Sequence, residues 1–180
     1  MLDLRKVSDG FAVAPQIDEA DVQAIADAGY KTLIANRPDG EGGIDQPRMG
    51  AIRTQAEALG LTFVAIPFSG APTPDILERF GSALSEAPTP ILAYCRTGTR
   101  STTLWSLGQA GQRSLADILA ATKAAGYDMG GVVRRIVNGG TTPTDQSDAK
   151  YDVVIVGGGA AGITVAASLR ERLPHGQIAL

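Results

Sequence analysis

The chain has 180 residues, of which 44% are hydrophobic and 19% are charged, and its formal net charge is −3. This composition is typical of a globular protein and excludes a disordered or fibrous chain, and the small negative charge gives no general basic surface for nucleic acid. The single cysteine excludes an intrachain disulfide framework, and the single histidine leaves no His/Cys cluster, so we expect no metal site. No apolar run approaches the roughly 20 residues of a membrane span. We therefore expect a cytoplasmic protein with neither a membrane nor a nucleic-acid partner.

Strands and helices alternate from the beginning of the chain. Asp18 and Thr73 are typical helix N-caps, and Gly29 and Gly60 are typical helix stops. The predicted strands cover residues 4–7, 11–13, 31–35, 61–66 and 90–94, and the predicted helices cover residues 18–29, 47–59, 73–84, 101–109, 114–125 and 128–137. The alternation predicts an α/β fold with a central, mostly parallel sheet flanked by helices, in which ligands bind at the carboxyl ends of the strands.

The pattern changes near the C-terminus. Residues 139–150 are small and polar with no apolar period, which is typical of a linker. A buried strand, a helix to about residue 172 and the start of a second strand follow. Between that first strand and the helix, Gly157, Gly159 and Gly162 match the dinucleotide-binding fingerprint. The expected parts are a first domain over residues 1–138, a linker over 139–150 and a truncated Rossmann βα unit over 151–180.

The only cysteine lies in a polar loop directly after the apolar run Ile91-Leu92-Ala93. The loop reads Cys95-Arg96-Thr97-Gly98-Thr99-Arg100-Ser101. Between a buried strand and a helix start, loop N–H groups and the positive helix end converge, which holds an anion and favours the thiolate. We therefore predict a reactive thiol at Cys95. The alternative is that it is a small buried apolar residue.

Residues from about 3 to 138 resemble the phosphatase-like domain at the front of beta-lactamase hydrolase-like proteins, a relative of dual-specificity tyrosine phosphatases. The residues that carry the resemblance are Ala14-Pro15-Gln16, Ala28-Gly29-Tyr30-Lys31-Thr32, Asn36-Arg37-Pro38-Asp39-Gly40-Glu41 and Tyr94 to Ser101. The resemblance implies a cysteine phosphatase-like fold in which Cys95 is the nucleophile and Arg100 clamps the phosphoryl oxygens. The substrate would be a phosphorylated protein or small molecule.

The chemistry of the loop supports these roles. The guanidinium of Arg100 matches two non-bridging oxygens, and loop amides bind the remaining one. The Ser101 hydroxyl can donate to the thiolate when it leaves a phosphocysteine, and Gly98 lets the backbone approach the ligand. Further candidates for phosphate contact are Arg96, which we expect to point outward, Thr97, Thr99 and, from another loop, Arg37.

Three features depart from the dual-specificity phosphatase pattern. Four residues rather than five separate Cys95 from Arg100, Tyr94 replaces the usual histidine, and residues 67–71 hold no carboxylate where those enzymes carry their general acid. The available substitutes are Asp39, Glu41 and Asp75. We prefer Asp39, because it follows a parallel strand and so lies at the same sheet edge as the cysteine. Alternatively, Asp39 begins a turn with its proline and glycine neighbours.

Two other functions stay open. The spacing also resembles the persulfide loop of rhodanese-like sulfurtransferases, in which Cys95 would accept a sulfane sulfur and no general acid would be needed. A non-catalytic phosphate-binding module would need only the anion cradle.

The C-terminal segment carries a second resemblance. Residues 151–180 resemble the opening of FAD-dependent pyridine nucleotide-disulfide oxidoreductases, which implies a fused or associated flavin oxidoreductase. We expect no cofactor in the first domain. A strand, a helix and a stub cannot bury a parallel strand on both faces, so we expect FAD to bind only to a longer parent protein.

Overall fold

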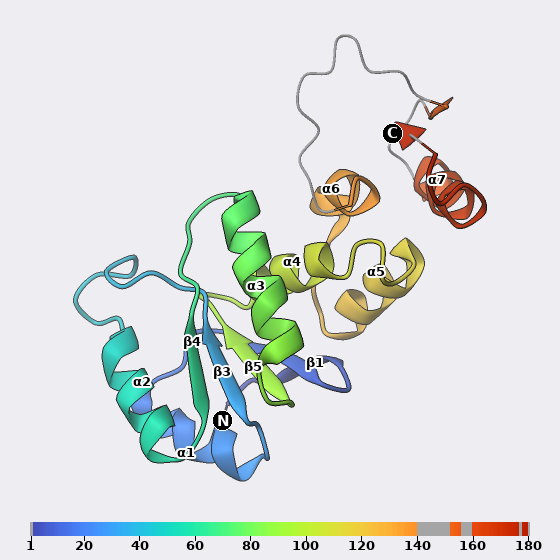
Figure 1. The fold of residues 1–180 in the computed structure, drawn as a ribbon. Helices are drawn as coiled ribbons and strands as arrows, with labels where there is room; N and C mark the ends of the chain where they lie inside the picture. Colours follow the sequence, from blue (N-terminus) through green and yellow to red (C-terminus); the bar gives the residue numbers. More distant parts are fainter. Residues whose placement is uncertain (1, 140–151, 156–159, 177, 180) are drawn as a thin grey trace. The chain divides into compact units, whose positions relative to one another are not determined.

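The computed structural model describes residues 2–139, 152–155, 160–176 and 178–179 (Figure 1). The chain forms two compact units, Met1–Leu104 and Trp105–Leu180. Of the expected linker, all but Gly139 lies outside the described residues, and the domain boundary expected at residue 138 stays a prediction.

The first unit is built on a five-stranded sheet with the order β1-β2-β5-β3-β4. The strands are β1 (Arg5–Ser8), β2 (Phe11–Ala14), β3 (Thr32–Ala35), β4 (Thr62–Ala65) and β5 (Ile91–Tyr94). β1 and β2 pair antiparallel as a hairpin, and all other pairs of this sheet are parallel. The predicted α/β fold with a mostly parallel central sheet is therefore confirmed. β5 lies between β2 and β3, so the carboxyl ends of three parallel strands meet at one edge.

Four helices follow the strands, as predicted. They are α1 (Glu19–Asp27), α2 (Met49–Ala58), α3 (Pro74–Glu86) and α4 (Thr99–Gly108). Asp18 caps α1 in a reciprocal capping box with Asp21, and the Thr73 hydroxyl accepts from the N–H of Ile76 at the start of α3. These local signals explain why the helix starts could be read from the sequence.

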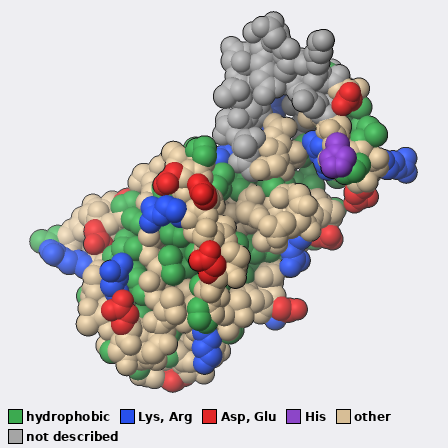
Figure 2. Space-filling view, in the orientation of Figure 1, with side chains coloured by type: hydrophobic (Ala, Val, Ile, Leu, Met, Phe, Trp, Pro, Cys, Tyr) green, Lys and Arg blue, Asp and Glu red, His purple; other side chains and the backbone are tan. Residues whose placement is uncertain are grey.

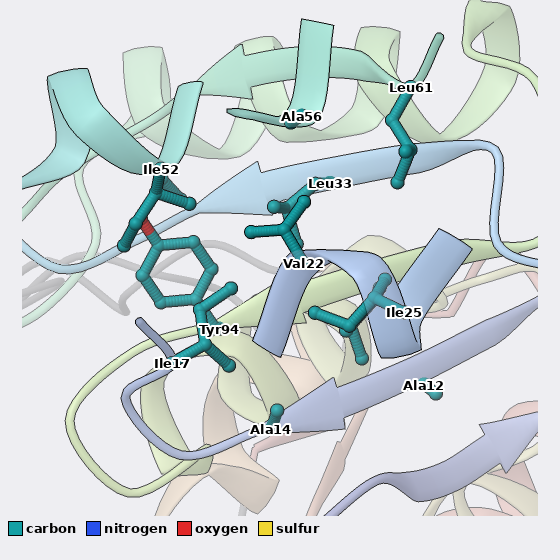
Figure 3. Close-up of a cluster of buried hydrophobic side chains, with 12 residues drawn as sticks. Ala12, Ala14, Ile17, Val22, Ile25, Leu33, Ile52, Ala56, Leu61 and Tyr94 are labelled. Atoms are coloured by element: carbon teal, nitrogen blue, oxygen red, sulfur yellow. The ribbon is translucent and has the colours of Figure 1, made fainter. Parts of the chain in front are cut away.

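Alternating strand residues face the two helical layers. On one face the strands pack against α1 and α2 in the cluster drawn in Figure 3, which includes Ala12, Ala14, Val22, Ile25, Leu33, Ile52, Ala56, Leu92 and Tyr94. On the other face the ring of Phe11 meets that of Phe80 from α3 edge to face, with 6.0 Å between the centroids. Packing on both faces fixes β5 and therefore the position of the loop that follows it.

The second unit contains α5 (Leu115–Ala124), a 3-10 turn (Gly130–Val132), α6 (Val133–Val137), β6 (Val153–Val154), α7 (Ala160–Arg172) and β7 (Ile178–Ala179). β6 and β7 pair in parallel, and α7 contacts α5 and α6. Of the fingerprint glycines, Gly162 lies in α7, and Gly157 and Gly159 lie outside the described residues.

The single helix predicted over residues 128–137 is wrong, because its first half is the 3-10 turn. Two adjacent glycines weaken a helix there, and the Asp128 carboxylate accepts from the N–H of Gly130 at 2.8 Å, which competes with helical bonding.

Figure 2 shows how charged side chains are distributed on one face of the molecule. On the face shown in Figure 2, Lys and Arg side chains are scattered among acidic ones and form no continuous basic patch over the described residues. None of the helices in the described ranges is long and apolar enough to cross a membrane.

Candidate active site

Cys95 follows β5 directly, at the edge where three strands end. Its N–H donates to the carbonyl of Ala14 at 3.4 Å, and the N–H of Asn36 donates to the carbonyl of Tyr94 at 2.9 Å, so backbone bonds tie the three strand ends together. The residue is only 1% exposed, as the apolar interpretation expects. Its sulfur, however, accepts a hydrogen bond from the N–H of Gly98 at 3.1 Å, and such a donor stabilises negative charge on sulfur.

The loop turns at Gly98, whose φ of 88° lies in the left-handed region that favours glycine. The carbonyl of Gly98 accepts from both the N–H and the hydroxyl of Thr102, which fixes the first turn of α4. Arg96, Thr97 and Thr99 are exposed, and the last two share a hydrogen bond between their hydroxyls at 3.1 Å. All three candidates are therefore accessible to solvent, and their contact with phosphate stays a prediction.

Arg100 lies in the first turn of α4 and is held by two protein acceptors. Its Nη1 donates to the carbonyl of Phe68 at 2.8 Å, and its Nη2 donates to Oε2 of Glu41 at 2.6 Å. The side chain is 18% exposed. The guanidinium thus points into the protein surface near the loop after β4 rather than into bulk solvent.

The Arg37 side chain is largely buried and contacts other protein side chains. Its Nε donates to the same Glu41 oxygen at 2.9 Å, its Nη1 donates to Oε1 of Gln16 at 3.0 Å, and its side chain is 9% exposed. The hydrogen bond from Arg100, aided by that from Arg37, holds the pKa of Glu41 below its ordinary value. The described contacts of Arg37 are therefore with the protein, and its predicted contact with phosphate stays a prediction.

The Ser101 hydroxyl has a definite acceptor. It is fully buried and donates to Oδ1 of Asn36 at 2.9 Å, while Nδ2 of Asn36 donates to the carbonyl of Ile66 at 3.0 Å. Because the carbonyl of Ile66 requires a donor, the orientation of the Asn36 amide is fixed, and its oxygen faces Ser101. The single hydroxyl proton is therefore directed to Asn36 in this state, and donation to the sulfur would require it to turn.

Asp39 has a structural contact. Its Oδ1 accepts from the N–H of Met49, the first residue of α2, at 2.8 Å, and the residue that precedes α2, Arg48, provides no side-chain cap. The pKa of Tyr94 is raised far above its ordinary range by burial and, to a smaller degree, by the charge of Asp39. The role of Asp39 as a proton donor stays a prediction.

The other acidic candidates differ in position. Asp75 lines a hollow together with residues of β4 and α3, and no residue of the cysteine loop lines it. Glu41 is the carboxylate that reaches Arg100. Within the described ranges, no group of three or more His, Cys, Asp or Glu side chains could hold a metal ion.

Several contacts of the site could not be named from the sequence. Asn36 and Gln16 appeared only as members of motifs, and the carbonyl of Phe68 has no sequence signature. A usable signal was present in the segment from Asn36 to Glu41, which places an amide, a guanidinium and two carboxylates directly after β3.

Comparison with known proteins shows the family to which the chain belongs. Residues 3–112 match the family described as beta-lactamase hydrolase-like protein, phosphatase-like domain. A beta-lactamase hydrolase-like protein of Agrobacterium fabrum is 34% identical over 130 residues, which cover 69% of this chain and 29% of the relative. The chain thus spans less than a third of the curated relatives that it matches.

Solved structures show the same fold. A candidate phosphatase from Neisseria meningitidis is 32% identical and has a TM-score of 0.69, with 77% of this chain and 99% of that chain covered. The catalytic core of a PP-IP phosphatase from S. cerevisiae has a TM-score of 0.52 at 17% identity, with 68% and 75% covered, and shows similarity of fold alone.

Proposed function

Because the chain belongs to the family of beta-lactamase hydrolase-like protein, phosphatase-like domains, we propose that its first unit hydrolyses phosphoryl esters through Cys95 and Arg100. The observation that carries the proposal is the hydrogen bond from the N–H of Gly98 to the Cys95 sulfur, at the N-terminus of the helix that carries Arg100. A sulfur in an apolar core would not have such a donor. The phosphatase-like family and its fold support the reaction class.

The proposed reaction has two steps. In the first, the Cys95 thiolate attacks phosphorus, an S–P bond forms, the ester P–O bond breaks, and the leaving oxygen takes a proton from solvent water. In the second, water attacks phosphorus, a P–O bond forms, the S–P bond breaks, and phosphate leaves with the thiolate restored. Arg100 and the loop amides stabilise the oxygens that carry charge in both transition states.

The need of the leaving group for a proton determines which substrates would be hydrolysed quickly. The loop after β4 holds no carboxylate at residues 67–71, and protonation of a poor leaving group is worth about 10²–10⁴-fold. Aryl phosphates, whose leaving oxygen needs little protonation, are therefore the substrate class that fits this site. Arg96, Thr97 and Thr99 line its open side and would meet the rest of the substrate.

Intact-protein mass spectrometry tests the proposal directly. The protein is exposed briefly to an aryl phosphate or to thiosulfate and quenched in acid. We expect a phosphate adduct, absent from Cys95→Ser, together with turnover of the aryl phosphate that this variant lacks. A sulfur adduct with thiocyanate production from cyanide would instead establish sulfur transfer. Phosphate binding without either adduct or turnover would establish a binding module.

We also infer that the C-terminal segment is the opening of a flavin-binding unit that belongs to a longer protein. The parallel pair β6 and β7, joined through α7, supports this assignment because it is the βαβ arrangement of dinucleotide-binding folds. Flavin absorbance in a purified longer protein, and its absence from these 180 residues, is the expected result. A longer protein that purifies without flavin and takes up none on titration would contradict it.

A further inference from the structure

One carboxylate oxygen joins the two arginines of the site. Oε2 of Glu41 accepts from Arg100 at 2.6 Å and from Arg37 at 2.9 Å, and 27% of the Glu41 side chain is exposed. Bonds of this charge-assisted kind are the strong ones, and sharing an oxygen between two cations favours the ionised carboxylate. The position of Glu41 therefore bears directly on the guanidinium of Arg100.

Glu41 is itself held by the loop after β3. Arg37 is anchored to Gln16, in the loop that follows β2, and a side chain on Gly42 would come within 2.5 Å of its Nη2. Gln46 closes the loop by accepting from the N–H of Gly42 at 2.7 Å and donating to the carbonyl of Pro38 at 2.8 Å. The carboxylate is thus held by hydrogen bonds in a loop that is itself closed by hydrogen bonds.

The contacts of Arg100 leave part of its guanidinium without a protein acceptor. A guanidinium has two edges that can bind a pair of oxygens, one formed by Nη1 and Nη2 and the other by Nε and Nη2. The carbonyl of Phe68 and the carboxylate of Glu41 take one N–H from each Nη. A guanidinium has five N–H groups, and among the described residues none accepts from Nε, so Nε and one N–H of each Nη can still bind oxygens.

We propose that Glu41 is a positioning residue, which holds Arg100 so that its remaining N–H groups, Nε among them, meet two phosphoryl oxygens above Cys95. This inference rests on the proposed function, because it assigns Arg100 to the phosphoryl group. Glu41 and the carbonyl of Phe68 fix the two Nη atoms of a long side chain in advance, which lowers the entropy lost when the ligand binds.

Two competing roles for Glu41 make different predictions. If its carboxylate occupied the place of the phosphoryl group, a ligand would have to displace it, and removing its charge would tighten phosphate binding. If Glu41 were the proton donor, its loss would slow alkyl phosphates and leave aryl phosphates unaffected. A positioning residue affects phosphate binding and both substrate types together.

The test compares Glu41→Gln with Glu57→Gln, which changes an exposed glutamate on α2. Inorganic phosphate is titrated by calorimetry, and kcat/KM is measured for an aryl and an alkyl phosphate. We expect Glu41→Gln to weaken phosphate binding and to lower both kcat/KM values by about tenfold, with Glu57→Gln unchanged. Tighter phosphate binding, loss confined to the alkyl substrate, or no change would each overturn the proposal.

Two further measurements separate positioning from a general loss of structure. Glu41→Gln should change the logarithm of the phosphate affinity less than half as much in an Arg100→Lys background as in the wild type, because its effect passes through the guanidinium. Equal effects in both backgrounds would contradict this. Glu41→Asp keeps the charge, so it should bind phosphate more tightly than Glu41→Ala. This comparison can be used even if Glu41→Gln does not fold. Equal phosphate affinity in Glu41→Asp and Glu41→Ala would count against the proposal.

The two proposals can fail separately. If the wild type binds phosphate in a Glu41-dependent manner but turns over no ester, the phosphatase proposal fails and the positioning of Arg100 stands. If the wild type turns over esters and Glu41→Gln has no effect, the phosphatase proposal stands and the positioning role of Glu41 fails. If it neither binds phosphate nor turns over esters, both are overturned.

Discussion

The Ser101 hydroxyl donates to the side-chain oxygen of Asn36 at 2.9 Å and so joins two buried residues that lie 65 positions apart in the chain. The same asparagine donates to the carbonyl of Ile66. One side chain thus links α4 of the candidate site to the ends of β3 and β4. Asn36 therefore connects the buried part of the first unit to the candidate site.

Asn36→Ala should destabilise the protein substantially. It leaves the Ser101 hydroxyl and the Ile66 carbonyl without their partners in a buried place, at about 1–3 kcal/mol for each group that water cannot reach. Chemical denaturation measures the free energy of unfolding. Ser85→Ala, which removes an exposed hydroxyl, is the control and should change it by less than about 0.5 kcal/mol. Equal values for the two variants would show that the Asn36 contacts contribute nothing.

Arg100→Lys should weaken both phosphate binding and turnover by at least about tenfold, because one ammonium cannot reproduce the two-oxygen edge of a guanidinium. Calorimetry with inorganic phosphate and kinetics with an aryl phosphate measure the two effects. Arg48→Lys, at an exposed arginine before α2, is the matched control. Wild-type affinity in Arg100→Lys would remove this residue from the phosphoryl site.

Asp39→Ala should lower the free energy of unfolding by about 1 kcal/mol, the typical value of a helix N-cap, and Asp39→Asn, which keeps an acceptor for the N–H of Met49, should lower it less. If Asp39 is also the proton donor, as the sequence predicts, Asp39→Asn should slow alkyl phosphates selectively. Equal effects on aryl and alkyl phosphates would leave Asp39 with the helix contact alone.

Because two arginines contact Glu41, the free energy of unfolding should depend on pH in the acidic range. Its pKa is lowered in the folded protein, so the stabilisation is fully present above its ordinary value of 4.5 and is lost as the pH falls through the folded pKa. The difference in unfolding free energy between the wild type and Glu41→Gln should therefore be constant near neutral pH and shrink below 4.5. A difference that grows on acidification would contradict the sign of this shift.

The elements of the first unit were predictable because their signals are local. Caps such as Asp18 and Thr73 fix helix starts, and apolar runs such as that before Cys95 mark buried strands. Strand alternation then places the cysteine at the sheet edge without knowledge of the strand order. The partners of the site were different, because they depend on which loops meet in space. The carbonyl that Arg100 contacts lies 32 positions away, and every residue has such a carbonyl.

Cys95 is the only thiol in the 180 residues. If peroxide converts its sulfur to a sulfenic acid, no second cysteine within this sequence can condense with it to form a disulfide. Reversal of that damage then requires a thiol from outside these 180 residues, and its access is limited because Cys95 is almost fully buried. The same burial thus slows both the oxidation of the sulfur and its repair.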